Sequence, residues 1–302
     1  MPERSAVRNI EPAMDDDPDP RMQLLETLRQ RSEENAAELS AFNAGCLRMA
    51  RQCVDLWHQL WRETPLAVDS ALEVKFRICF PLAAHALNHV DAALGLHVER
   101  PWVAASSTRV AFEHAIAAQW VLLTVDGERE LVNWMKRQQY VRAKEIADAL
   151  GRLASDPGAS GLALNESQRQ SLVGDPPDSS GWSVANACSR FSDTKLFYDI
   201  YRNLSQAEHP SPGLIASHLA VTPAGVQGNI SAAGALHPSG EVPQALALSA
   251  LWSLYVLEQL RQGQPYAATV AHIGHEASLP TDLRASDQHP ERQPEGLRHR
   301  DD

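Results

Sequence analysis

The sequence of 302 residues lacks long apolar runs and an excess of basic residues. No stretch approaches the roughly 18 apolar residues of a membrane-spanning helix, and the first twenty residues have no apolar signal segment. Lysine and arginine number 27 against 38 acids, so the formal net charge is −11. We therefore expect a soluble cytoplasmic protein with no membrane partner and no broad, non-specific binding to nucleic acid, which needs a basic surface. A small local basic site remains compatible with this charge.

Cysteine is also scarce, with only Cys46, Cys53, Cys79 and Cys188 in the chain. No CxxC pair is present, which argues against a zinc knuckle, and seven residues of helix separate Cys46 from Cys53 too widely for a disulfide. The chain has no HExxH motif, no GxSxG motif and no glycine-rich loop between a strand and a helix. We expect reduced, buried thiols and no cofactor.

Apolar residues recur at steps of three and four positions through most of the chain, which is the pattern of amphipathic helices. The segment 101–125 is the most apolar and is expected at the centre. No internal repeat and no series of strands is evident. The sequence therefore predicts an all-α fold, a helical bundle of about six or seven helices with a long loop and disordered termini.

The composition changes at both ends and once in the middle. We predict a disordered acidic tail over residues 1–20, one helical domain over 21–275 and a disordered tail over 276–302. Residues 155–184 are rich in Gly, Ser, Pro and Asp, and we predict a long loop around one short helix. Asn165 and Gln168 have the spacing of a capping box at the start of that helix. Long ordered loops often serve as lids or binding loops.

The stretch "FYDIYRNLSQAEHPSPG" carries the strongest candidate site. On one helix, Tyr198, Arg202, Ser205 and His209 would share a face. Pro210 is expected to end this helix, which places His209 at the negative end of the helix dipole and favours a positively charged imidazole.

An arginine that holds a phosphate and a histidine that moves a proton are the groups that metal-free RNA cleavage requires, because the RNA supplies its own 2′-OH nucleophile. Asn203 would orient a phosphate or the histidine of a partner subunit. A purely structural alternative stays open. Asp199 and Arg202 have the spacing of an ion pair, and His209 could satisfy the last carbonyls of its own helix.

The segment "YRNLSQAEHPSPGL" resembles a motif of a bacterial all-α family of unknown function, in which a Tyr precedes Leu-Ser and then a His followed by Pro or Ala and Ser. That family also tends to carry an Arg with a Glu four residues later in a preceding apolar helix, as Arg109 and Glu113 do here. The likeness extends as a pattern over about residues 45–262.

More distantly, Arg202-Asn203 with His209 is similar to the signature of HEPN domains, which are all-α, usually dimeric and often metal-independent ribonucleases. The resemblance implies that Arg202 binds phosphate, that His209 does acid–base work and that Asn203 supports them.

Two further pairs of residues attract attention. Arg109 and Glu113 face each other at i,i+4, and we favour a structural role for the pair over a role in lining a pocket. His85 and His89 also stand at i,i+4 and could hold a metal from one helix, with His58, Glu113 or His114 as further ligands. The alternative is that the two histidines are ordinary core or polar residues.

Three functional hypotheses follow from the sequence. The first is a HEPN-like, metal-independent endoribonuclease or RNA-phosphate-binding protein, with RNA as its partner and with a homodimer compatible with the resemblance. The second is a non-catalytic protein-interaction or sensor module that binds a protein partner. The third is a helical-bundle metalloprotein that uses His85 and His89.

Overall fold

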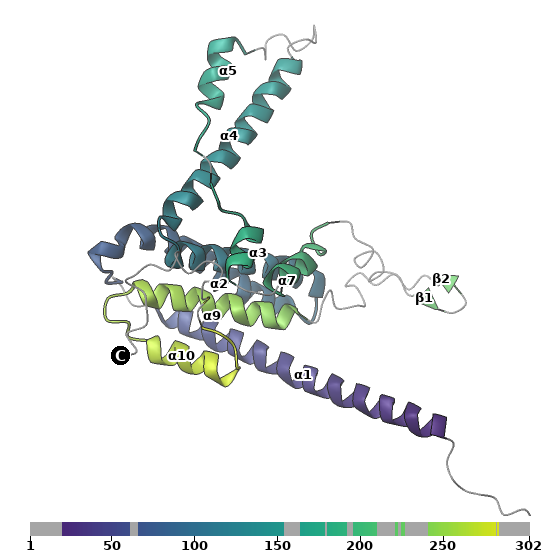
Figure 1. Cartoon of the computed structure of the whole chain (residues 1–302). Helices are drawn as coiled ribbons and strands as arrows, with labels where there is room; N and C mark the ends of the chain where they lie inside the picture. Colours follow the sequence, from purple (N-terminus) through teal and green to yellow (C-terminus); the bar gives the residue numbers. More distant parts are fainter. Residues whose placement is uncertain are drawn as a thin grey trace, which may run out of the picture. The chain divides into compact units, whose positions relative to one another are not determined.

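The computed structural model describes residues 20–60, 66–153, 164–178, 180–191, 196–209, 221–222, 225–226, 241–281 and 283, with the side chains of the first helix described from Glu34 onward. These residues form nine α-helices, one short 3₁₀ helix and one pair of two-residue strands. The predicted all-α class is confirmed (Figure 1). The predicted N-terminal tail, apart from Pro20, and most of the predicted C-terminal tail lie outside the described residues.

The elements follow one another as α1 (Pro20–Leu60), η1 (Ser70–Leu72), α2 (Glu73–Leu96), α3 (Pro101–Leu123), α4 (Gly127–Leu153), α5 (Glu166–Val173), α6 (Val184–Phe191), α7 (Leu196–Ser205), β1 (Val221–Thr222), β2 (Gly225–Val226), α9 (Val242–Leu260) and α10 (Ala267–Glu276). The strands pair in antiparallel fashion, with Val221 opposite Val226. Contacts divide the chain into two compact units within α1: residues 1–42 and residues 43–302. The single domain expected over 21–275 stays a prediction.

In the second unit, α3 lies at the centre of the core. Helices α2 and α9 pack along it, and α4, α6 and α7 contact it as well (Figure 1). Alanines on α3 are fully buried and allow close approach of its neighbours, while Phe112 and Trp120 fill the space between them. Phe112 packs against Trp252 of α9 with ring centroids 5.8 Å apart. The expected central position of this apolar helix is therefore confirmed.

The corner between α3 and α4 depends on glycine. Asp126 has a positive φ of 56°, and a Cβ on the following Gly127 would lie only 2.9 Å from the carbonyl oxygen of Trp120. No other residue fits this approach without moving backbone, so Gly127 fixes where α4 begins.

A lysine from α2 satisfies the end of α3. The Nζ of Lys75 donates to the carbonyl oxygens of Val121, Leu122 and Thr124 at 3.1, 3.1 and 3.3 Å. These carbonyls belong to the last turn of a helix, where intrahelical donors run out. Burial lowers the pKa of Lys75, and Glu128 offsets part of that effect. The contact ties α2 to the end of α3.

Asp69 caps η1 and accepts a hydrogen bond from the Ala71 amide at 2.9 Å. Helix α2 follows η1 directly and runs from Glu73 to Leu96. Helix α10 was not predicted. The described part of the predicted 155–184 loop does contain one short helix, α5, and its capping box between Asn165 and Gln168 is confirmed.

All four cysteines are free and buried, as expected. Burial raises the pKa of Cys53 and of Cys79 to about 12, so both thiols stay protonated near neutral pH. In the described part of the chain, no helix is both long and apolar enough to cross a bilayer.

Candidate functional site

Arg109 of α3 is the centre of a polar cluster that joins α3 to α7. Its Nε donates to Ser205 Oγ at 3.0 Å, its Nη1 to Glu208 Oε2 at 2.5 Å and its Nη2 to the Tyr201 hydroxyl at 2.6 Å. Glu113 lies 3.5 Å from Nη2. Four side chains thus contact the guanidinium, and only 18% of the Arg109 side chain is exposed. Arg109 and these four residues are hereafter the Arg109 cluster.

The charges of the Arg109 cluster compensate one another. Burial disfavours the charged guanidinium, but Tyr201, Glu208 and Glu113 outweigh this and raise the pKa of Arg109. Burial and then Glu113 raise the pKa of the Tyr201 hydroxyl, and Arg109 offsets only part of that rise. The arginine therefore stays charged and the tyrosine stays protonated, so each keeps the hydrogen bond that joins them.

The structure thus brings together the two motifs that the sequence suggested separately. Arg109 and Glu113 come from one motif, and Tyr201 and Ser205 from the other. Sequence reasoning selected Tyr198, whose ring instead stacks on that of Tyr201 at 6.3 Å. The missed signal was the i,i+4 spacing of Tyr201 and Ser205. The structural role favoured for Arg109 fits this geometry.

Arg202 lies beside this cluster but outside it. Its side chain is exposed, and no ion pair joins it to Asp199 or to another residue that the structure describes. The ion pair weighed as a structural alternative therefore does not form there.

His209 is placed differently from the prediction. Helix α7 ends at Ser205, and three turn bonds follow, the last from the Glu208 amide to the Ser205 carbonyl at 3.1 Å. His209 lies after them in a bend and is exposed. The expectation that one helix carries both Arg202 and His209 is wrong, because the Ser205 hydroxyl bonds the Tyr201 carbonyl at 2.8 Å where the helix stops.

Asn203 connects α7 to the start of α9. Its Nδ2 donates to both carboxylate oxygens of Glu241, at 3.2 and 3.0 Å. Glu241 directly precedes α9. The Asn203 amide nitrogen is therefore engaged with a carboxylate, while its carbonyl oxygen keeps the capacity to accept a hydrogen bond.

Three imidazoles gather between α2 and α3. His85 lies 4.5 Å from His89 and 4.6 Å from His114, measured between ring centroids, and the rings meet edge to face. Burial, followed by the neighbouring imidazoles, lowers the pKa of His85 and of His89. The Nδ1 of His114 lies 2.8 Å from the Val110 carbonyl oxygen. We call these three residues the histidine cluster.

The other ligands weighed for a metal have different partners. His58 contacts Asp91 at 3.3 Å, and Glu113 belongs to the Arg109 cluster. No group of three or more His, Cys, Asp or Glu side chains with a metal-binding arrangement occurs among the residues that the structure describes. The histidine cluster is therefore described as two ring contacts, in which His85 meets both His89 and His114.

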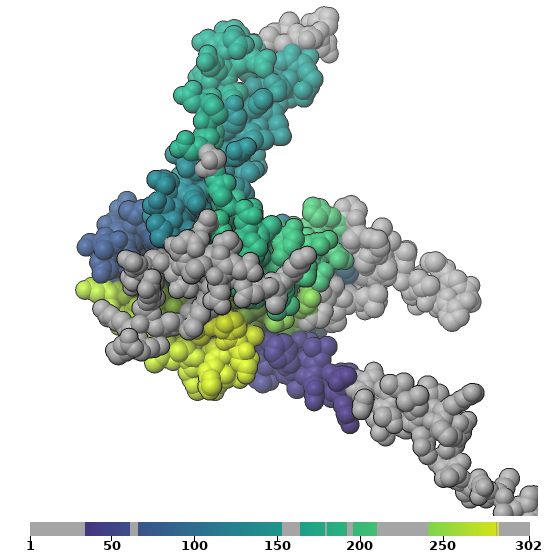
Figure 2. Space-filling model, in the orientation of Figure 1, coloured from purple at the N-terminus to yellow at the C-terminus, as the bar shows by residue number. Residues whose placement is uncertain are grey.

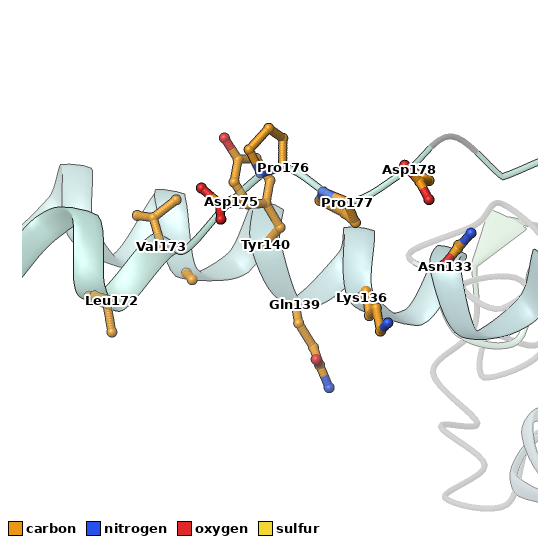
Figure 3. Close-up of a pocket in the computed structure, with 11 residues that line it drawn as sticks. Asn133, Lys136, Gln139, Tyr140, Leu172, Val173, Asp175, Pro176, Pro177 and Asp178 are labelled. Carbon is orange, nitrogen blue, oxygen red and sulfur yellow. The ribbon is translucent and has the colours of Figure 1, made fainter. Parts of the chain in front are cut away.

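A cleft of about 530 Å³ lies between α4 and the segment that follows α5. In Figure 3 the segment from Asp175 to Asp178 runs along α4, with Tyr140 and Lys136 below it. Its walls combine the apolar surfaces of Leu172 and two prolines with acidic and basic groups. The space-filling view in Figure 2 shows the adjoining surfaces of α4 and α5. This cleft falls partly within the region 155–184 predicted as a long loop.

Comparison of the chain with protein-family models, with curated proteins and with solved structures gave no match. The resemblance to the bacterial family and to HEPN domains therefore stays a prediction. The functional proposals rest on the contacts of the clusters above.

Proposed function

We propose that the exposed end of α7 binds an RNA phosphate and cleaves the RNA chain without a metal ion. The observation that supports this proposal is the contrast between two arginines. Arg109 is engaged by three hydrogen bonds and two ion pairs, whereas Arg202 is exposed and has no ion pair with any described residue. An unpaired guanidinium keeps its forked donors available for two phosphate oxygens.

The proposed reaction uses the RNA 2′-OH as the nucleophile. His209 accepts the 2′-OH proton while the 2′-oxygen forms a bond to phosphorus, and the bond from phosphorus to the 5′-oxygen breaks. The leaving 5′-oxygen takes a proton from water. The products are a 2′,3′-cyclic phosphate and a 5′-hydroxyl. Arg202 compensates the negative charge that develops on the non-bridging oxygens.

Neighbouring contacts hold this end of α7 in place. The Arg109 cluster fixes Tyr201, Ser205 and the turn that precedes His209. Asn203 is a positioning residue, because its amide donates to Glu241 at the start of α9. Arg202 is thus an exposed side chain in the last turn of α7, and His209 is an exposed side chain that follows the anchored turn.

The test incubates the purified full chain with RNA in EDTA and measures 2′,3′-cyclic phosphate ends. We expect cleavage by the parent and a loss of roughly a hundredfold or more in the Arg202→Ala and His209→Ala variants. Arg77→Ala and His272→Ala are matched controls, since both residues are exposed and lie in ion pairs elsewhere.

Two results would distinguish RNA cleavage from RNA-phosphate binding alone and from a wrong assignment of the site. Binding of RNA that Arg202→Ala abolishes, without cleavage, would reduce the proposal to RNA-phosphate binding. If the parent neither binds nor cleaves RNA, or if both variants act like the parent, the assignment to α7 is wrong.

The cleft between α4 and α5 favours a second candidate function, a non-catalytic protein-interaction module. Tyr140, Leu172 and Pro176 give it apolar walls, and Asp175 and Asp178 add acidic groups. Such a cleft suits a short apolar segment of a protein partner that carries a basic residue. In this case Tyr140→Ala and Leu172→Ala would abolish partner binding, and Arg202→Ala would leave it unchanged.

A further inference from the structure

The first unit of the chain presents an apolar helical face with no described partner. Leu39 and Phe42 of α1 are 54% and 40% exposed, although both are large apolar residues. They lie three residues apart on a continuous helix, so they share one side of it. Exposed apolar residues in such a pattern are typical of an interaction surface.

These two residues belong to a regular heptad pattern. From Leu39 and Phe42, alternating steps of four and three residues along α1 define the a and d positions of a heptad. In the second unit these positions hold five buried residues, Cys46, Met49, Cys53, Leu56 and Leu60. In the other direction the pattern continues to Leu25 and Leu28 at the corresponding a and d positions. A heptad repeat of apolar residues is the pattern of a helix that packs against another helix along its length.

Within residues 25–42 the pattern is interrupted once, at the middle of this stretch, by two polar residues. Ser32 and Asn35 occupy the a and d positions between the two apolar pairs. Polar residues at core positions of a coiled coil lower its stability but fix its register, because they must lie opposite one another. The apolar pairs are therefore arranged symmetrically on either side of a polar centre.

We propose that residues 22–42 of α1 form an antiparallel coiled coil with the same residues of a second copy of this chain. In this arrangement every core position finds a matching residue. The layers pair Leu25 with Phe42, Leu28 with Leu39 and Ser32 with Asn35 of the second copy, and the two-fold symmetry repeats each layer once.

The charges beside the core select this partner and this orientation. Arg31 and Glu38 both occupy g positions. In the antiparallel register, Arg31 of each copy lies beside Glu38 of the other, so two opposite-charge pairs flank the core. In a parallel pair, Arg31 would instead lie beside Ala36 and Glu38 beside Asn43, and neither contact is an ion pair. The described side chain of Glu38 is exposed, as this pairing requires.

The test measures the mass of the full chain by light scattering and sedimentation over a wide range of protein concentration. We expect a dimer of twice the 33.2 kDa chain that dissociates on dilution, because the core is only a few layers long. Leu39→Asp is expected to give a monomer. Arg31→Glu alone and Glu38→Arg alone create like-charge pairs and should each weaken the dimer roughly tenfold.

The double variant Arg31→Glu with Glu38→Arg restores both charge pairs and should restore the dimer. Only the antiparallel register predicts this rescue. Glu34→Arg is the matched control, since its position faces away from the core, and circular dichroism checks that each variant keeps its helix. A monomeric parent, a dimer that survives Leu39→Asp, or a double variant no tighter than the single ones would each overturn the proposal.

Discussion

Helix α3 carries two polar clusters within an apolar core, and they handle charge in opposite ways. On the side of α7, Arg109 keeps its charge because Glu113, Glu208 and the Tyr201 hydroxyl surround it. On the side of α2, His114 meets His85 and His89, and burial favours the neutral form of those two imidazoles.

Helix α3 thus accommodates Arg109 and His114, two ionisable residues five positions apart, in two different ways. The Arg109 cluster is stable only if all its charged members are present, since each member compensates another. The histidine cluster needs no opposite charge while its rings are neutral, but its contribution to stability depends on the pH. Removal of a single group should therefore affect the two clusters very differently.

The largest expected effect is that of Arg109→Ala. It leaves Glu113 and Glu208 without their cation. It also removes two hydrogen bonds from α3 to α7 and one to the turn after α7, so we expect a loss of about 3 kcal/mol in the free energy of unfolding. Denaturant unfolding measures this loss. Arg109→Lys should recover only part of it, because an ammonium group cannot replace a forked guanidinium. A loss below about 1 kcal/mol would mean that the cluster is not a structural unit.

A smaller effect is expected for Tyr201→Phe. This variant removes the 2.6 Å hydrogen bond to Arg109 but keeps the ring, whose centroid lies 4.8 Å from the guanidinium carbon. We expect a loss of about 1 kcal/mol in the free energy of unfolding. Tyr198→Phe is the control, since the Tyr198 contact with Tyr201 is made by the ring. Equal losses in both variants would argue against a specific role for the Tyr201 hydroxyl.

The histidine cluster should make stability depend on pH. Folding lowers the pKa of His85 and of His89 below the ordinary value of 6.5, so the unfolded chain binds protons first as the pH falls. Above pH 6.5 both histidines are neutral in the folded and the unfolded chain, and the free energy of unfolding has its full value. As the pH falls below 6.5 and through the lowered pKa values, the free energy of unfolding decreases.

Thermal unfolding between neutral and mildly acid pH measures this effect. The melting temperature should fall on acidification, and the fall should be smaller in a His85→Gln, His89→Gln double variant. His209→Gln is the control, because His209 is exposed and lies outside the cluster. An unchanged pH profile in the double variant would rule out this source of acid sensitivity.

The smallest effect on stability is expected for Arg202→Ala. Arg202 is exposed and has no ion pair with a described residue, so the free energy of unfolding should change by no more than about 0.5 kcal/mol. Denaturant unfolding of Arg202→Ala and Arg109→Ala under the same conditions compares their free energies of unfolding directly. A large loss for Arg202→Ala would show that this residue is structural and would remove the reason to propose it as a phosphate ligand.

The sequence predicts those features of the fold that depend on neighbouring residues. The capping box of Asn165 and Gln168 spans three positions and is present, and Pro101 occupies the first turn of α3, where its missing N–H costs nothing. The apolar composition of 101–125 also identifies α3 as a buried helix.

The sequence could not predict contacts between distant residues. Tyr201 and Arg109 are 92 positions apart, and no local pattern indicates that their helices pack with these two side chains in contact. The end of α7 was placed too late because Pro210 marks a limit that a helix cannot pass, whereas the Ser205 hydroxyl bonds the backbone four residues before His209.

The contact of Lys75 with the end of α3 has a consequence for chemical modification of the protein. Acetylation of this amine would remove its charge and most of its donors, and three carbonyl oxygens would lose their shared partner inside the fold. Acylating reagents should therefore label Lys75 mainly in molecules that have opened at this corner, because only 17% of its side chain is exposed. The rate at which Lys75 is labelled, relative to exposed lysines such as Lys136, would report how often α2 and α3 separate.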